Sequence, residues 1–222
     1  MPTKKKSKRY GLGKLDPQWR QKIFDSIKSE RFKLAIAVLS ATGCRPVELE
    51  SGVILHLVED HIQIGIRGAK VDTTTRRGQP LRLLRIDSGT PWGEYLREHL
   101  LRADRNLITV KYDAGSLSQR LREKSKVLWP RQKTLISAYS YRHFLGKSMK
   151  ESGEDPVKIA STLGHASDYS QTCYGRAGGG KRSSGQHGVI SAVATNPIRH
   201  SSKCDKVSKM ITCAELKRWR GS

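Results

Sequence analysis

Two arginines, a histidine and a tyrosine follow one another along this chain in an order that suits chemistry on a phosphodiester. Arg45 lies in the stretch Thr-Gly-Cys-Arg-Pro-Val-Glu-Leu, and Arg142 lies far downstream of it. His165 ends a Leu-Gly-His sequence, and Tyr174 comes nine residues later. A guanidinium binds two phosphate oxygens at once, which a lysine ammonium cannot do. Positive charge also helps to deprotonate a phenol, whose pKa is otherwise about 10. These are the parts needed to hold a phosphodiester and attack it without a metal ion.

Charge and composition narrow the class of partner. The chain has 222 residues, with 42 Lys and Arg against 20 Asp and Glu, and a formal charge of +22. Folding does not require this excess, so it indicates a polyanion: nucleic acid, an anionic membrane surface or a ribosomal assembly. No apolar run approaches the roughly 18 residues of a membrane span, so a membrane-spanning protein is excluded. The basic start has no apolar stretch behind it, unlike a secretory signal.

The cysteines predict neither a metal site nor a disulfide framework. Cys44, Cys173, Cys204 and Cys213 show no C-x-x-C spacing and no histidines at metal-site intervals. No cofactor is therefore expected, and a reducing, cytoplasmic compartment fits this composition.

The pattern of the chain predicts helices, then a small sheet, then helices again. β-Branched runs at 53–58, 61–66 and 81–86 predict a three-stranded antiparallel sheet, with a polar loop over 68–80. Helical periodicity and capping residues predict helices at 17–29, 32–42, from 46, 90–103, 115–126, 137–151 and 155–163. Gly164 should stop the last of these helices, and a further short helix could carry Tyr174.

These elements divide the chain into three parts. Residues 1–15 form a basic N-terminal arm, and residues 16–175 form one α+β domain that is mostly helical. Residues 176–222 combine a flexible linker rich in Gly, Ser, Lys and Arg with a C-terminal helical segment. That segment, 207–219, is amphipathic, and it packs either on its own domain or on a neighbouring protomer.

The helix, sheet and helical-bundle order over about 17–175 resembles the catalytic domain of the tyrosine recombinase (phage integrase) family. The resemblance implies that Arg45 and Arg142 are the two catalytic arginines and that Glu48 supports the first of them. It also implies that Lys70 is the β-hairpin lysine, His165 the histidine of the Leu-Gly-His element and Tyr174 the nucleophile. Lys70 would then protonate the departing 5′ oxygen. Without that role it is a solvated loop lysine.

One position departs from the family pattern. The family usually has a histidine three residues before the second arginine, and this chain has Tyr139. Three residues make nearly one helical turn, so residue 139 should face the same site as Arg142. A phenol can donate a hydrogen bond to phosphate but is a weaker proton shuttle near pH 7 than an imidazole. His143 is turned by about 100° on the helix, so it is not an obvious substitute.

Other tyrosines and basic residues have competing interpretations. Tyr169 and Tyr141 also lie near the constellation, but the spacing from Leu-Gly-His favours Tyr174, and Tyr169 is interpreted as a core or DNA-facing residue. One group of arginines either follows the DNA backbone or forms a solvated face: Arg76, Arg77, Arg82 and Arg85. Lys181 and Arg182 are expected to contact phosphate in a tail. Residues 175–181 fit the start of a P-loop, but Arg182 replaces the magnesium-binding Ser or Thr and no strand precedes them.

The resemblance implies a site-specific recombinase or integrase of the kind found in mobile elements. It would cut and rejoin double-stranded DNA through a 3′-phosphotyrosine, without metal or ATP, as a homo-oligomer (tetramer) on paired sites near the nucleoid. Two alternatives are a type IB topoisomerase and a catalytically silent DNA-binding module. Family members generally carry a DNA-clamping domain before the catalytic one, and here only about fifteen residues precede the first predicted helix. The chain is therefore expected to be either a fragment or similar to compact members such as fimbrial-switch invertases.

Overall fold

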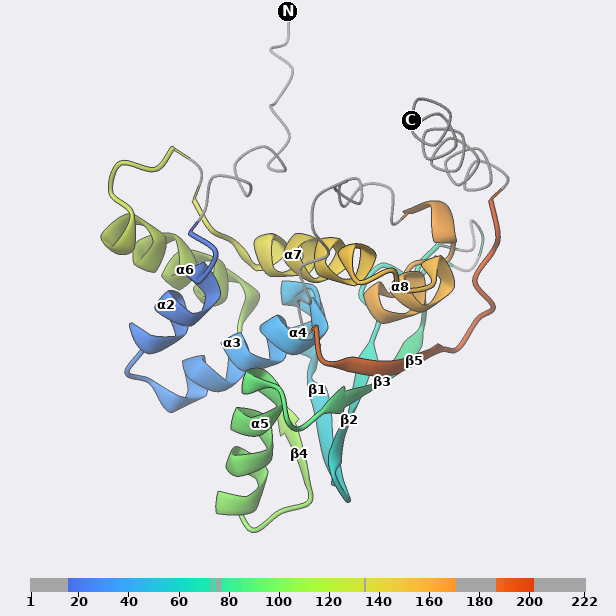
Figure 1. Ribbon diagram of the computed structural model, residues 1–222, viewed down its shortest axis with the longest axis horizontal. Helices are drawn as coiled ribbons and strands as arrows, with labels where there is room; N and C mark the ends of the chain where they lie inside the picture. Colours follow the sequence, from blue (N-terminus) through green and yellow to red (C-terminus); the bar gives the residue numbers. More distant parts are fainter. Residues whose placement is uncertain (1–15, 73, 75–76, 134, 171–186, 202–222) are drawn as a thin grey trace, which may run out of the picture.

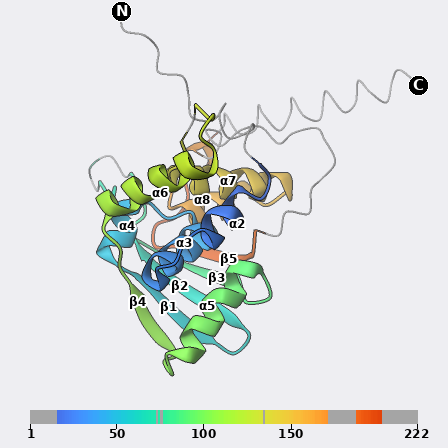
Figure 2. The same ribbon diagram turned by 90° about the vertical axis from the view of Figure 1, so that its left-hand side faces the viewer.

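The computed structural model describes residues 16–72, 74, 77–133, 135–170 and 187–201. Helices cover one face of an antiparallel sheet and gather at one of its ends (Figures 1 and 2). The helices are α2 Trp19–Asp25, α3 Glu30–Thr42, α4 Pro46–Ser51, α5 Pro91–Arg102, α6 Ala114–Leu128, α7 Ala138–Glu151 and α8 Pro156–Leu163. The strands are β1 Val53–Val58, β2 His61–Arg67, β3 Leu81–Asp87, β4 Leu107–Val110 and β5 Val189–Ala194.

The sheet has five strands in the order β4-β1-β2-β3-β5, so the predicted three-stranded sheet was wrong in its extent. The three predicted strands form its centre and match their expected bounds closely. The two missed strands pair only with partners far away in sequence, β4 with β1 and β5 with β3. Their stability comes from that non-local pairing, which a short local pattern does not reveal.

The inner face of the sheet builds the core with α3 and α5, which cover it in Figure 2. Ile62, Ile64 and Ile66 alternate along β2 and are fully buried, and Leu84 and Ile86 continue this face on β3. Full burial of such a side chain stabilises the fold by about 1.5–3 kcal/mol. Strand β3 places Arg82 on the same face, opposite Ile66. A cationic side chain is therefore buried at a position where the neighbouring side chains of the sheet are apolar.

Capping side chains explain where the helices begin and end. The predicted helix 17–29 is shorter, because α2 ends at Asp25 and Ser29 caps α3 by accepting a hydrogen bond from the Phe32 amide at 3.4 Å. The prediction for α8 is confirmed: Asp155 caps its start and accepts from the Val157 amide at 2.6 Å. Gly164 ends α8 in the left-handed conformation, with φ of +65°.

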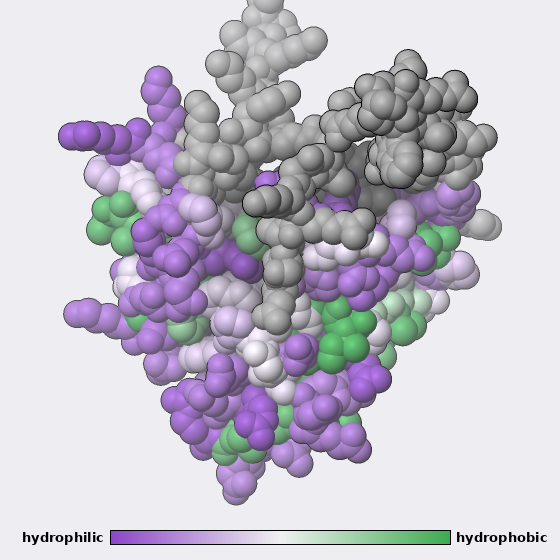
Figure 3. Space-filling model, viewed as in Figure 1, coloured by the Kyte–Doolittle hydropathy of each residue, from purple (hydrophilic) through white to green (hydrophobic). Residues whose placement is uncertain are grey.

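The described residues on the face drawn in Figure 3 are mostly hydrophilic. On the face drawn in Figure 3, apolar side chains gather over β5, where Ile190 and Val193 are exposed. Within the described part of the chain, no helix is both long and apolar enough to cross a membrane. The N-terminal arm, the helix predicted at 207–219 and the predicted linker up to residue 186 lie outside the described residues. The described strand β5 falls within 176–222, the part that was predicted to hold a linker and a helical segment.

Candidate active site

Arg45 and Glu48 close the first turn of α4 on each other. Arg45 is the N-cap residue in an extended conformation, and Pro46 starts the helix with its fixed φ. Glu48 accepts a hydrogen bond from the Arg45 backbone amide at 2.8 Å and from Arg45 Nη1 at 2.6 Å. The Thr-Gly-Cys-Arg-Pro-Val-Glu-Leu stretch therefore fixes both the backbone and the guanidinium of Arg45. The Arg45 side chain keeps 12% of its surface exposed.

Arg82 is a third guanidinium in this cluster, and its role was not predicted from the sequence. It is fully buried and forms a bidentate pair with Glu48, with Nη2–Oε2 at 2.7 Å and Nη1–Oε1 at 3.2 Å. Arg82 Nε donates to the Thr162 carbonyl oxygen at 3.0 Å. The expectation that Arg82 follows DNA or lies on a solvated face was therefore wrong. Its place in the alternation with Leu84 and Ile86 was the signal that could have revealed it.

Glu48 stays ionised because two arginines share its carboxylate. Burial alone would raise its pKa, but the charge and hydrogen bonds of Arg82, followed by those of Arg45, lower it to about 2. A Cβ at Gly164 would lie 2.7 Å from Arg82 Nη1, so the same glycine that stops α8 also leaves room for this guanidinium.

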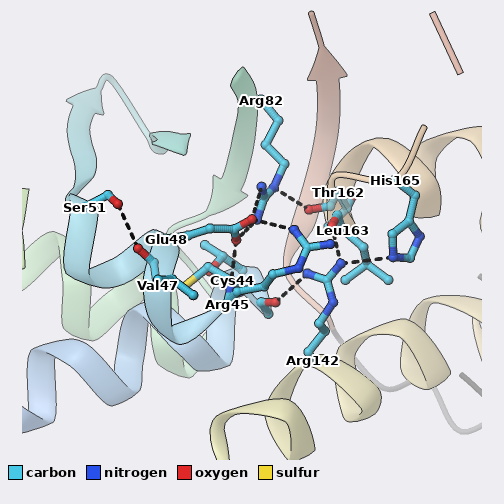
Figure 4. A network of polar contacts seen from close by, with 12 residues as sticks. Cys44, Arg45, Val47, Glu48, Ser51, Arg82, Arg142, Thr162, Leu163 and His165 are labelled. Carbon is cyan, nitrogen blue, oxygen red and sulfur yellow. Dashed lines mark hydrogen bonds and ion pairs between the residues drawn. The ribbon is translucent and has the colours of Figure 1, made fainter. Parts of the chain in front are cut away.

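Arg142 joins three segments from its position on α7. It is buried and donates from Nη1 to the Gly43 carbonyl oxygen at 3.0 Å and from Nη2 to the Leu163 carbonyl oxygen. Its Nη2 also lies 3.0 Å from His165 Nε2. These bonds tie the end of α3 and the end of α8 to one guanidinium. The two predicted arginines and Glu48 therefore meet in one cluster with His165 (Figure 4).

His165 is held as a neutral imidazole. Burial lowers its pKa most, the charges of Arg142, Arg45 and Arg82 lower it further, and Glu48 only partly opposes them, so that the pKa falls to about 2. A guanidinium only donates hydrogen bonds, so Nε2 accepts from Arg142 and the neutral ring carries its proton on Nδ1. His165 is thus suited to orienting Arg142 rather than to exchanging a proton near pH 7.

The neutral state of His165 should make stability depend on pH. The unfolded imidazole titrates near 6.5 and the folded one near 2, so below pH 6.5 the unfolded state binds a proton that the folded state does not. Stability is therefore expected to fall as the pH drops below 6.5, with a slope of up to about 1.4 kcal/mol per pH unit from this residue. Urea unfolding of the wild-type and His165→Gln proteins between pH 7.5 and 4.5 measures it. Equal slopes in the two proteins would contradict the assignment.

The cluster concentrates positive charge in a small volume. It holds three guanidinium groups, on Arg45, Arg82 and Arg142, and one carboxylate, on Glu48, which pairs with Arg45 and Arg82, so an excess of two positive charges remains. Figure 4 shows the three groups between Glu48 and His165. Fixed donors in a partly buried site act on a neighbouring anion far more strongly than they would in water. The arrangement is suited to binding a phosphate group.

The other predicted residues are exposed or fall outside the described chain. Lys70 is exposed in the connection between β2 and β3. Tyr139, in the first turn of α7, is 39% exposed, and Arg77 is exposed beside Asp72, with which it forms an isolated β-bridge. The predicted nucleophile and three of the predicted DNA contacts fall outside the described residues: Tyr174, Arg76, Lys181 and Arg182.

Two of the competing tyrosines have clear environments. Tyr141 is buried and packs edge-on against Trp19, with ring centroids 4.7 Å apart, so it belongs to the core. Burial also raises the pKa of Tyr141, which makes it a poor nucleophile. Tyr169 is 41% exposed just after the Leu-Gly-His turn. The interpretation of Tyr169 as a core residue was therefore wrong, and its interpretation as a DNA-facing residue stays a prediction.

The known proteins that this chain resembles are solved structures, and the resemblance is one of fold. Neither the models of protein families nor the curated proteins gave a match to this chain. The crystal structure of XerA recombinase matches with a TM-score of 0.51 and 21% identity, over 72% of this chain and 58% of that one. Two crystal structures of XerH site-specific recombinase, a post-cleavage complex with a palindromic difH substrate and a pre-cleavage complex with difH substrate, have TM-scores of 0.52 and 0.51.

The XerH structures share 20% and 19% identity with this chain, over 72% of it in both cases. The matches cover 48% and 49% of the XerH chains, so this chain spans about half the length of the XerH structures it matches. At this level of identity the likeness extends to the arrangement of helices and strands. The described chain therefore has a fold similar to part of these recombinase structures.

Proposed function

We propose that this chain is a tyrosine-type DNA strand transferase that acts as a site-specific recombinase or integrase. The observation that carries the proposal is the convergence of Arg45, Arg142 and His165 in one cluster, in which Arg45 pairs with Glu48 and Arg142 contacts His165. The formal charge of +22 supports a nucleic acid as the partner. The DNA substrates named for the XerH structures, which share the fold, support the same choice.

In the proposed reaction the arginines bind the phosphate while a phenol attacks it. Arg45 and Arg142 hold the non-bridging oxygens, and the Tyr174 oxygen forms a bond to phosphorus while the bond to the 5′ oxygen breaks. Lys70 gives its proton to that 5′ oxygen, and the phenol proton passes to water under the positive field of the cluster. His165 orients Arg142 through the contact between its Nε2 and Arg142 Nη2. Its pKa of about 2 makes it too weak a base to take the phenol proton at neutral pH.

The product of this step is a 3′-phosphotyrosine and a free 5′ hydroxyl. Attack by a 5′ hydroxyl from another strand reverses the chemistry, restores the phenol and joins two different DNA strands. The ester retains the energy of the original bond, so neither ATP nor a metal ion takes part. Exchange between two duplexes requires a protomer at each cleaved strand, hence a homo-oligomer, a tetramer on paired sites.

Replacing Tyr174 by phenylalanine is expected to abolish covalent capture of DNA, because the attacking oxygen is lost. The measurement is incubation with a nicked suicide substrate in EDTA, followed by denaturing electrophoresis of the protein–DNA adduct. Tyr169→Phe is the matched control, and it is expected to keep the adduct. An adduct of normal yield with Tyr174→Phe would refute the nucleophile.

A second candidate is a DNA-binding module without catalytic activity. Two observations favour it. Position 139 carries a tyrosine instead of a histidine, and the pKa of His165 is too low for this imidazole to exchange a proton near neutral pH. Specific binding to one DNA site, with no adduct on any nicked, supercoiled or linear substrate, would support this candidate over the strand transferase.

A further inference from the structure

Arg82 lies between the two parts of the cluster that hold Arg45 and Arg142. Its side chain has no exposed surface. Its Nη1 and Nη2 donate to the Glu48 carboxylate at 3.2 and 2.7 Å, and its Nε donates to the Thr162 carbonyl oxygen at 3.0 Å. Figure 4 draws Arg82 with dashed lines to both partners. All three guanidinium nitrogens therefore bind the protein itself, and none is placed to receive a phosphate oxygen.

On one side, Arg82 is connected to Arg45 through a shared carboxylate. Glu48 Oε1 accepts from Arg45 Nη1 at 2.6 Å and also from Arg82 Nη1. Glu48 Oε2 accepts from Arg82 Nη2 and from the Arg45 backbone amide at 2.8 Å. Each carboxylate oxygen can accept two hydrogen bonds, so these four contacts use the full capacity of Glu48. Arg82 thus fixes the orientation of Glu48, and Glu48 fixes that of the Arg45 guanidinium.

On the other side, Arg82 is connected to the segment that holds Arg142. The Thr162 carbonyl group lies in the last turn of α8, and the next carbonyl along the chain, that of Leu163, accepts from Arg142 Nη2. A Cβ at Gly164 would lie 2.7 Å from Arg82 Nη1, so this helix end packs directly on the Arg82 guanidinium. The two arginines therefore bind consecutive carbonyl groups of one helix end.

Stability alone does not account for an arginine at this position. Arg82 alternates along β3 with Leu84 and Ile86, which are buried aliphatic residues of the core. Replacing a buried ion pair by well-packed apolar side chains is often neutral or stabilising, because the charges no longer have to be taken out of water. An aliphatic residue would therefore serve the core at least as well. What it could not do is bind Glu48 and the Thr162 carbonyl oxygen together.

We propose that Arg82 is a positioning residue that sets the place of Arg45 relative to Arg142, without touching DNA. This role rests on the proposed function, in which both guanidinium groups bind oxygens of one phosphate and must be spaced to fit it. Displacement of a reacting group by about 1 Å can slow a reaction about a hundredfold. Loss of the Arg82 contacts is therefore expected to slow cleavage by between about tenfold and a hundredfold. DNA affinity should change little, since it comes from many positive charges.

The test compares Arg82→Lys with Arg85→Lys, the matched control on the same strand. A lysine at position 82 keeps a positive charge beside Glu48, but an ammonium cannot form the bidentate pair and the bond to Thr162 together. Arg85 is exposed, so its replacement leaves both connections intact. Single-turnover adduct formation on the suicide substrate measures cleavage, and affinity for an intact DNA site is measured in parallel. Urea unfolding gives the folded fraction of each protein.

A double-mutant cycle distinguishes positioning from a general loss of stability. If Arg82 acts through Arg45, the loss of cleavage caused by Arg82→Lys should be at least about threefold smaller in an Arg45→Lys background than in the wild type. The same reduction is expected in an Arg142→Lys background. A defect that only lowered stability would leave the losses multiplicative once each rate is corrected for the folded fraction.

The expected result is slower cleavage by folded Arg82→Lys, an unchanged dissociation constant, normal behaviour of Arg85→Lys and a non-additive cycle. Glu48→Asp offers a second route if Arg82→Lys does not fold, because a carboxylate shortened by one methylene cannot hold Arg45 and Arg82 at the same time. An active wild type with Arg82→Lys or Glu48→Asp at full rate, or with an additive cycle, overturns the positioning role alone. A wild type that forms no adduct overturns both this role and the proposed function.

Discussion

Replacing Arg142 by lysine is expected to slow DNA cleavage at least about a hundredfold while the DNA still binds. An ammonium cannot bind two phosphate oxygens together, and one lost donor in such a site costs about 3–4 kcal/mol of transition-state stabilisation. Arg142 also donates to the Gly43 and Leu163 carbonyl oxygens, which a lysine could satisfy only in part. Single-turnover adduct formation measures the rate, and binding to uncleaved DNA measures the affinity.

Arg45→Lys separates loss of chemistry from loss of folding. The Arg45 side chain is partly exposed, whereas that of Arg142 is buried, so a lysine at position 45 should disturb packing less. Both variants should lose cleavage to a similar degree, while only Arg142→Lys should lower the unfolding midpoint measurably. Cleavage within a factor of three of the wild type in a folded Arg45→Lys protein would argue against the phosphate-binding role.

Glu48→Gln is expected to destabilise the fold by about 3–5 kcal/mol, because it leaves the Arg82 guanidinium buried without a counter-charge. Arg82 has no exposed surface on its side chain, and its bidentate partner is Glu48. The measurement is urea unfolding at neutral pH. A loss below about 1 kcal/mol would show that the buried pair is not required for stability.

The double variant Glu48→Gln/Arg82→Met distinguishes stability from function. Replacing both members of a buried ion pair by neutral groups is often nearly neutral for stability, so most of the loss should be recovered. Cleavage should not be recovered, because Arg45 would still lack the carboxylate that orients it.

The folded pKa of Glu48 lies near 2 against an ordinary value of 4.5. Its ionic contribution is therefore complete above pH 4.5 and is lost as the pH falls from there towards 2.

The sequence predicted those parts of the site that depend on local geometry. Arg45 and Glu48 lie three residues apart at a helix start, so their contact follows from one turn of helix. The caps of α8 and the stop at Gly164 likewise follow from neighbouring residues. Contacts between distant segments were not predictable in this way. Gln79, which lies just before β3, has no local signal at all, since its side chain binds backbone atoms of His165 and Asn196, which are 86 and 117 positions away.

Arg82 shows where charge alone is a misleading guide. Its neighbours Arg76, Arg77 and Arg85 suggested a basic surface, yet the pleat of β3 turns Arg82 inward and Arg85 outward. The alternation was present in the sequence, but it was outweighed by the general rule that arginines stay in water. A charged residue that alternates along a strand with two buried aliphatic residues is better interpreted as one member of a buried ion pair.

The last described strand has a consequence for synthesis of the protein on the ribosome. β3 gains its outer neighbour only when residues 189–194 have been made, more than a hundred residues after β3 itself. Until then the nascent chain presents an open row of amide and carbonyl groups, which invites pairing with other unfinished chains. Messages truncated between β3 and β5 should therefore yield aggregates, and chaperone dependence should end once β5 has emerged.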